Sequence, residues 1–148
     1  MKFDCSIRPD FMLLTNNNLE AWNFVETYVN WCHQVDDLID KDKEVSDESI
    51  VEMQLNWLMT VSGNVFFQAN KNFLMPLLIM TSNAWLDANH WEKSKDRSKR
   101  THSDVVKSLY HEVVFACVYL CGGWAALRRF TTLHREYQKD NYYGNVCT

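Results

Sequence analysis

Three aspartates near residue 40 have the spacing in this chain that is best suited to chemistry. Asp36, Asp37 and Asp40 form an Asp-Asp-x-x-Asp motif in a segment with a helical hydrophobic pattern. Residues four apart lie on one side of a helix, so Asp36 and Asp40 can direct two carboxylates toward one point. Two like charges that close destabilise a helix unless a cation lies between them or water screens them. The motif therefore predicts either a divalent-metal site or a solvated helix end.

A second group of polar side chains follows further along the chain. Asn83 and Asp87 are four residues apart and share a helix face, and His90 and Glu92 come soon after them. Mg²⁺ takes oxygen ligands and often bridges carboxylates to phosphates. An aspartate pair on one helix that faces an Asn–Asp pair on another would suit a magnesium ion and a diphosphate. Whether His90, Glu92 or the more distant Glu112 joins such a site is left open by the sequence.

Charge is segregated along the chain. Residues 36–52 contain eight acids and two bases, a net charge of −6, whereas residues 92–100 contain five bases and two acids, a net charge of +3. An acidic helix end and a basic loop could together hold a metal and a polyphosphate, with Lys93, Arg97 and Arg100 binding the phosphate oxygens. Two solvated loops would give the same composition.

The elements that must position these residues are predicted to be helices. The 148 residues include only four glycines and two prolines, and strong alternating strand patterns are missing. Pro76 is compatible with a helix only in its first turn. Helical spacing predicts helices over residues 16–41, from 46 or 47 to 63, 72–91, and from 101 or 103 to about 124, with a short one after 130. We expect one all-α domain over residues 1–148, a compact bundle of about four to six helices whose ends fray at about 1–10 and 141–148.

A helical wheel of the first long helix predicts which of its sides faces the core. Asp36 and Asp40 lie at the edge of the apolar arc, and Asp37 points further away, beside His33. The arc contains Phe24, Tyr28, Trp31, Val35, Leu38 and Ile39. Asp36 and Asp40 are therefore better placed than Asp37 to reach a cleft between helices.

Composition excludes some classes of function. A formal charge of −4 argues against a general nucleic-acid binder. Five cysteines form no Cys-x-x-Cys pair, which favours a reduced, cytoplasmic protein, and charges interrupt any N-terminal signal peptide. The fifteen charge-free residues 113–127 are fewer than the roughly twenty that a membrane span requires. We expect no nucleic-acid partner and no stable membrane span.

The two acidic motifs resemble those of a known family. Residues 32–40, Cys-His-Gln-Val-Asp-Asp-Leu-Ile-Asp, look like the first aspartate-rich motif of the squalene and phytoene synthase group of class I isoprenoid synthases. Residues 82–87, Ser-Asn-Ala-Trp-Leu-Asp, look like the start of their second motif. The basic loop at residues 93–100 follows where that family carries arginines. The resemblance implies an all-α fold and a Mg²⁺-dependent transferase or lyase acting on a prenyl diphosphate.

The resemblance also implies roles for the matching residues. Asp36 and Asp40 would bind one magnesium ion with Asp37 as a supporting acid, and Asp87 with Asn83 would bind the other. Departures from the family indicate a reduced or divergent member. Trp91 stands where the second motif repeats its acid, and Glu92 follows one place late. Since the chain is also shorter than such enzymes, a homodimer could be needed to complete the substrate pocket.

Two other interpretations stay open. Small all-α nucleotide pyrophosphohydrolases also place acidic pairs on two helices, and Glu112 or Asp104 could supply the second acid here. A helical interaction protein without catalytic activity could instead use Trp22, Trp85 and Trp91 at an interface. Turnover of a prenyl diphosphate, hydrolysis of a nucleotide, or neither would distinguish the three.

Overall fold

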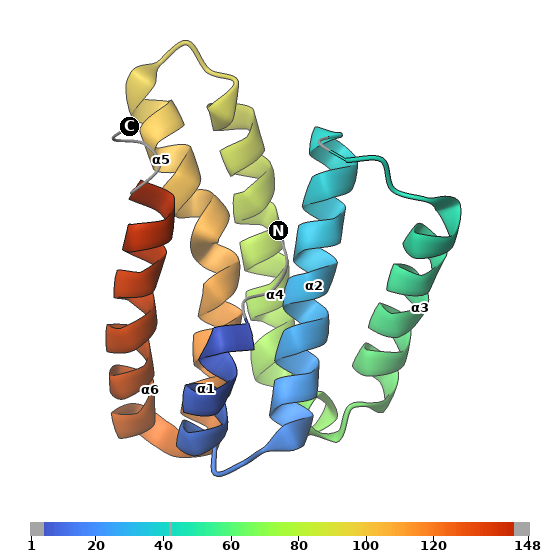
Figure 1. The fold of residues 1–148 in the computed structure, drawn as a ribbon, viewed down its shortest axis with the longest axis vertical. Coiled ribbons are helices and arrows are strands. Elements are labelled where there is room, and N and C mark those ends of the chain that lie inside the picture. Colours follow the sequence, from blue (N-terminus) through green and yellow to red (C-terminus); the bar gives the residue numbers. More distant parts are fainter. Residues whose placement is uncertain (1–4, 42, 144–148) are drawn as a thin grey trace.

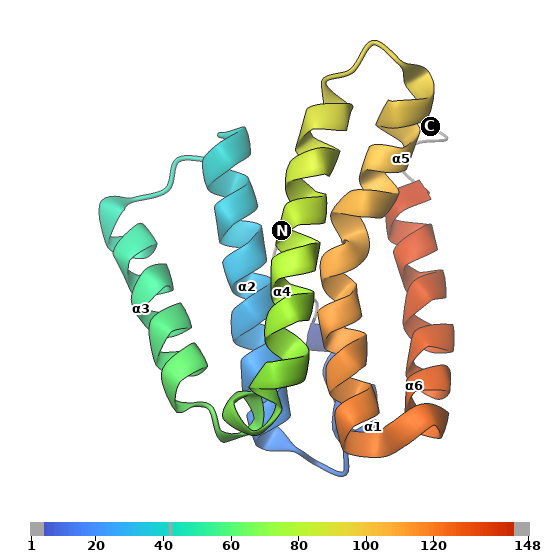
Figure 2. The ribbon, with the colours of Figure 1, turned by 180° about the vertical axis from the view of Figure 1, so that it is seen from behind.

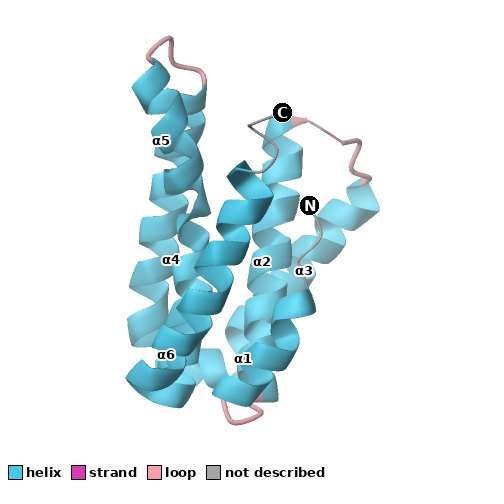
Figure 3. Ribbon diagram, turned by 60° about the vertical axis from the view of Figure 1, so that its left-hand side comes forward, coloured by secondary structure: helices cyan, strands magenta, loops and turns pink. Residues whose placement is uncertain are grey.

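The computed structural model describes residues 5–41 and 43–143, which fold into a bundle of helices (Figure 3). The described part contains no strand, which confirms the predicted all-α class. In chain order the elements are η1 (Cys5–Ile7), α1 (Arg8–Leu14), α2 (Leu19–Asp40), α3 (Asp47–Gly63), α4 (Val65–Glu92), α5 (Arg97–Lys107), η2 (Ser108–Tyr110) and α6 (His111–Tyr143). Helices α2 and α4 lie in the middle, with α3 on one side and α1, α5 and α6 on the other (Figures 1 and 2).

Local capping explains why α2 and α3 begin and end as predicted. The Asn18 side chain accepts a hydrogen bond from the Ala21 amide at 3.0 Å and caps the start of α2. Lys41 ends α2 in the left-handed conformation, with φ of 57°. The Ser46 hydroxyl caps α3 through the Ser49 amide at 3.2 Å. These signals are contained in a few neighbouring residues, so the sequence reveals them directly.

Helix α4 begins earlier than predicted. The Asn64 side chain accepts a hydrogen bond from the Phe67 amide at 2.7 Å, which caps the helix at Val65 rather than at residue 72. Pro76 therefore lies inside the helix, and the expectation that it occupies the first turn is wrong. A proline there removes one backbone hydrogen bond. Burial of the neighbouring Leu74 and Leu78 offsets that loss.

The predicted fourth helix is three elements. Helix α5 begins at Arg97, capped by Asp96, whose carboxylate accepts from the Ser98 amide at 2.8 Å. The 3₁₀ turn η2 then separates α5 from α6. Within α6, Gly123 has φ of 75° and ψ of −167°, and the chain reverses its direction there (Figures 1 and 2). A single continuous helix to residue 124 is therefore wrong.

The N-terminal segment belongs to the fold. Residues 5–10, expected to fray, form η1 and the start of α1, while residues 1–4 and 144–148 lie outside the described residues. Phe11 in α1 is fully buried. Its ring makes edge contacts with Trp22 of α2 at 5.4 Å and with Phe130 of α6 at 6.0 Å. Helix α1 therefore closes the bundle between α2 and α6.

Aromatic rings fill much of the core around α2. Phe24 stacks on Phe67 of α4 with ring centroids 5.0 Å apart, and Trp31 stacks on Trp57 of α3 at 5.2 Å. Trp22 is only 1% exposed, so it packs in the core and does not present the interface surface considered for it. Ile39 is expected in the core but is 51% exposed, because it lines an open pocket between α2, α4 and η2.

One stretch of the described chain, Arg97–Arg135, is long and apolar enough to cross a membrane by length and composition alone. Its best window has a mean hydropathy of 1.3, and 39% of that window is buried inside the bundle. The stretch also includes the reversal at Gly123. A core helix of a bundle can pass the same test, so the expected lack of a stable span stays a prediction.

Candidate functional site

Asp36 and Asp40 converge on one cation, and that cation is a lysine of the chain itself. The Lys107 ammonium, at the end of α5, lies 3.3 Å from Asp36 Oδ1 and 3.4 Å from Asp40 Oδ2. Glu92, at the end of α4, brings its Oε2 to 3.6 Å from the same nitrogen. Three helices thus meet at a cluster of three carboxylates and one ammonium, which we call the Lys107 cluster.

Partial burial strengthens these ion pairs. The Lys107 side chain is 22% exposed, and the Asp36 and Asp40 side chains are 35% and 29% exposed. Burial alone would lower the pKa of Lys107, but the nearby Asp36, Glu92 and Asp40 carboxylates outweigh it and raise the pKa. The Oδ1 of Asp36 is buried, and the Lys107 ammonium is its charged partner. The cluster keeps a net charge of −2.

A mostly apolar pocket adjoins the cluster. Its volume is about 360 Å³, and it lies between α2, α4 and η2. Asp36 and Lys107 are the charged members of its wall. The other lining residues are Tyr28, Trp31, Cys32, His33, Val35, Ile39, Thr81, Ser82, Trp85, Leu86 and Tyr110. The pocket therefore offers apolar walls together with a carboxylate–ammonium pair.

The Cys32 thiol and the Tyr28 hydroxyl in the pocket wall keep their protons at physiological pH. Burial raises the pKa of the Cys32 thiol to about 12 and also raises the pKa of the Tyr28 hydroxyl. Tyr28 Oη and Thr81 Oγ1 share a hydrogen bond of 3.3 Å, and His33 Nε2 lies 3.2 Å from Tyr110 Oη. A thiol with so high a pKa is a poor nucleophile. These groups can orient a ligand but supply no thiolate.

The structure separates the other predicted metal ligands from the Lys107 cluster. Asp37 points away from the cluster and pairs with Lys43 at 3.2 Å. Asn83 Nδ2 donates to Asp87 Oδ2 at 3.4 Å on the exposed side of α4. Among the described contacts, Glu92 rather than Asp87 is the α4 acid that shares a cation with Asp36.

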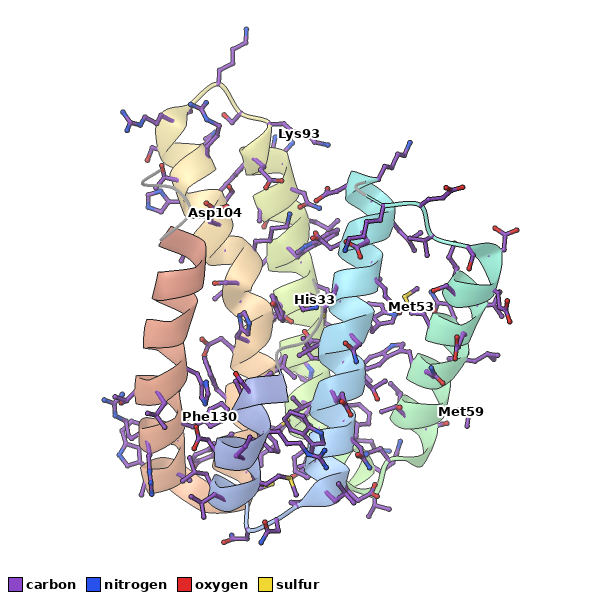
Figure 4. The ribbon with its side chains drawn as sticks, in the orientation of Figure 1. His33, Met53, Met59, Lys93, Asp104 and Phe130 are labelled. Atoms are coloured by element: carbon purple, nitrogen blue, oxygen red, sulfur yellow. The ribbon has the colours of Figure 1, made fainter. Side chains whose placement is uncertain are left out.

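The basic residues expected to bind phosphate lie where α4 turns into α5. Lys93 ends α4, at the tip of the helical hairpin (Figure 4), and Arg97 begins α5. Arg100 donates from Nη1 to the Ser94 carbonyl at 2.8 Å, which uses this guanidinium to close the loop. All three are exposed. Lys107 stands at the opposite end of α5 and is the base that faces the pocket.

Two other acids lie outside the cluster. Glu112 pairs with Arg135 at 2.6 Å, and both line a separate groove between α4 and α6. Asp104 is exposed on α5 (Figure 4). His90 is exposed near the end of α4. Of the residues that the sequence left open, Glu92 is the one that joins Asp36 and Asp40.

The residue missed by sequence reasoning is Lys107. Its signal is present, because Lys107 is the one lysine or arginine among residues 101–127. A charged side chain in such a stretch needs a partner when the helix packs. Nothing in the sequence alone, however, identifies acids more than 60 residues away as that partner. Asp40, for example, is separated from Lys107 by 67 residues.

The oxygen atoms of the Lys107 cluster suit a hard cation, but the Lys107 ammonium occupies the place where such a cation would bind. Carboxylate oxygens are the ligands that Mg²⁺ prefers. The Lys107 ammonium holds the point toward which these oxygens are directed. Within the described residues, no group of three or more His, Cys, Asp or Glu side chains is arranged to hold a metal ion. The expected magnesium site stays a prediction.

Comparisons with protein-family models, with curated proteins and with solved structures found no match. The resemblance to isoprenoid synthases therefore depends on the two short acidic motifs. The all-α class rests on the structure.

Proposed function

We propose that the pocket between α2, α4 and η2 binds a small prenyl diphosphate together with Mg²⁺, as a reduced relative of the isoprenoid synthases would. The observation that carries this proposal is the apolar pocket of about 360 Å³ beside the convergent Asp36 and Asp40. Small-molecule sites are typically apolar cavities of about this size with a few fixed polar groups. Trp31, Trp85 and Leu86 would cover the prenyl chain.

Charge decides how a diphosphate head could be held. Three carboxylates around one ammonium repel an anion, so the head group requires an additional cation. Magnesium, when bound, would neutralise the diphosphate. Lys107 could then leave the carboxylates and donate to the phosphate oxygens, because its flexible stem allows a shift of the ammonium. Asp36 and Asp40 would provide oxygen ligands, and the tryptophans would exclude water from the chain of the ligand.

The test is thermal melting with Mg²⁺ plus either pyrophosphate or geranyl diphosphate. Binding to the native state should raise the melting temperature by mass action, with the larger shift for geranyl diphosphate because its chain enters the pocket. Asp36→Asn should abolish the shift. Asp37→Asn is the matched control, because Asp37 lies on the same helix but pairs with Lys43, and it should keep the shift.

Release of pyrophosphate from geranyl diphosphate would extend the proposal from binding to catalysis. Hydrolysis of a nucleoside triphosphate to its monophosphate would instead favour the pyrophosphohydrolase. The absence of any magnesium-dependent shift, or an equal loss in Asp36→Asn and Asp37→Asn, would contradict the proposed site.

A second candidate ligand is an amine with an apolar body. Three carboxylates in the structure already surround an ammonium, which is the observation that favours it. Such a ligand would replace the Lys107 ammonium and place its apolar part in the same pocket. Stabilisation by octylamine without magnesium, and none by geranyl diphosphate with it, would favour this ligand class.

A further inference from the structure

Large apolar side chains are exposed beside each of the turns at one end of the bundle, and four of them are considered together. Leu13 is 61% exposed, Leu19 50%, Val65 70% and Trp124 68%. They stand where α1 meets α2, where α3 meets α4, and where α6 reverses, and all three turns lie at the same end of the molecule (Figures 1 and 2). We call these four residues the apolar end.

Hydrogen bonds join the three turns into one platform. Asn16 Nδ2 donates to the Cys121 carbonyl at 3.4 Å, and Asn18 Nδ2 contacts Cys121 Sγ at 3.5 Å, which links the α1–α2 turn to α6. Asn64 Nδ2 donates to the Glu20 carbonyl at 2.9 Å, which links the α3–α4 turn to α2. The exposed apolar side chains are therefore held in place relative to one another.

The same end is basic, although the whole chain carries a net charge of −4. Its segments, residues 11–23, 57–71 and 117–132, contain three bases and one acid, a net charge of +2. The acid, Glu20, accepts a hydrogen bond from Asn64 at 3.2 Å. Arg128 and Arg129 follow Trp124 in the chain by about one helical turn. Apolar side chains thus stand beside positive charge.

We propose that the apolar end docks on the surface of a bilayer that contains anionic phospholipid. Tryptophan favours the membrane–water boundary, where its ring is apolar and its N–H stays hydrated. Exposed Leu and Val side chains gain free energy on entering the acyl region, and arginines beside them attract anionic head groups. These are the features that the three turns present together.

Charge also argues against a second copy as the occupant. A two-fold dimer brings the same surface of each chain together. Such a contact would bring two surfaces of net positive charge together, and like charges would oppose association. An anionic bilayer has the complementary charge. This proposal is independent of the proposed function, because the Lys107 cluster is formed by other ends of the helices.

Flotation with lipid vesicles tests the proposal on the full chain. We expect binding to vesicles of phosphatidylcholine and phosphatidylserine, weaker binding to phosphatidylcholine alone, and loss of the difference at high salt. Trp124→Ser should lower the affinity about tenfold, the effect of removing one large apolar side chain from a binding surface. The paired Arg128→Gln and Arg129→Gln change should remove the preference for the anionic vesicles.

Val105→Ser is the matched control. Val105 is 50% exposed on α5, away from the three turns, so its replacement should leave vesicle binding unchanged. No binding to either vesicle, equal binding to both, or an equal effect of Trp124→Ser and Val105→Ser would overturn the proposal. A dimer in light scattering that Trp124→Ser dissolves would also overturn it, because the apolar end would then be a contact between copies.

Discussion

At the scale of single residues, Lys107 explains how the chain tolerates its acidic motif. Asp36 and Asp40 lie one helical turn apart, an arrangement that repulsion would disfavour. The ammonium of Lys107 lies within 3.4 Å of an oxygen of each, and Glu92 completes its surroundings. The question posed by the sequence, a cation or water, thus has its answer in this structure: a cation supplied by the chain itself.

We predict that Lys107→Met destabilises the fold by about 1–3 kcal/mol, because it leaves three carboxylates without their counter-charge. Urea unfolding at neutral pH measures the change. Lys43→Met is the control, since the Lys43 side chain is 58% exposed and its ion pair with Asp37 is largely hydrated, and it should cost less than about 0.5 kcal/mol. Equal costs for the two variants would contradict the special role of Lys107.

The raised pKa of Lys107 sets the pH range of its contribution. The group is charged in both the folded and the unfolded chain below its ordinary pKa of 10.5, so its stabilisation is fully present there. The stabilisation is lost as pH rises through the higher folded pKa. On the alkaline side of neutrality, the difference between wild type and Lys107→Met should therefore persist until the solution is strongly alkaline.

His111 gives a second pH dependence, on the acid side. Burial lowers the pKa of His111 from its ordinary value of 6.5 to about 4, and the charges of His33 and Arg135 add to the effect. As pH falls, His111 takes up a proton in the unfolded chain at a higher pH than in the folded one. The free energy of unfolding therefore falls by roughly 2–3 kcal/mol as pH drops from about 6.5 toward 4. In His111→Gln this part of the decline should disappear. Melting curves of both proteins between those pH values measure it, and parallel curves would refute the prediction.

At the scale of elements, two glycines allow α6 to reverse. Gly123 has a positive φ that other residues rarely adopt. At Gly122, an added Cβ would overlap the Leu14 carbonyl oxygen and approach Ala126 Cβ to 2.6 Å. Backbone and a short side chain cannot move aside cheaply, so this glycine lets α1 contact α6 closely.

We predict that Gly122→Ala and Gly123→Ala each lower the unfolding free energy by about 1–3 kcal/mol, the first through overlap and the second through backbone strain. Gly63→Ala is the control, because no atom lies within 4 Å of an added Cβ and its φ is not positive. That variant should be neutral or slightly more stable. The denaturant midpoints of the three variants, compared with that of the wild type, test this prediction. An unchanged midpoint for Gly122→Ala would contradict it and would show that α1 can shift away from α6.

The elements also show where sequence reasoning succeeds. Helices α2 and α3 were predicted within a few residues, because Asn18, Ser46 and Lys41 act on their immediate neighbours. The start of α4 was missed because Pro76 was assumed to mark a first turn. Packing of Leu74 and Leu78 into the core overrides that preference.

At the scale of the whole molecule, the pocket is complete within one chain. Helices α2 and α4 and the turn η2 all contribute to its wall, so a second copy is not needed to form it. The expected homodimer stays a prediction. Light scattering checks it: a dimer would have twice the chain mass of 17.5 kDa, and the mass of one chain at working concentration would contradict the prediction.

By itself the sequence determined the helical class, the approximate bounds of α2 and α3, and the side of α2 on which Asp36 and Asp40 lie together, because these follow from spacing along one helix. Only the tertiary structure decided what those carboxylates face. Lys107, Glu92 and the pocket-lining tryptophans come from separate segments, and their meeting depends on how α4 and α5 pack against α2. Contacts between distant segments leave no periodic signal in the chain. The sequence therefore could not show that Lys107, and not a metal ion, lies between these carboxylates.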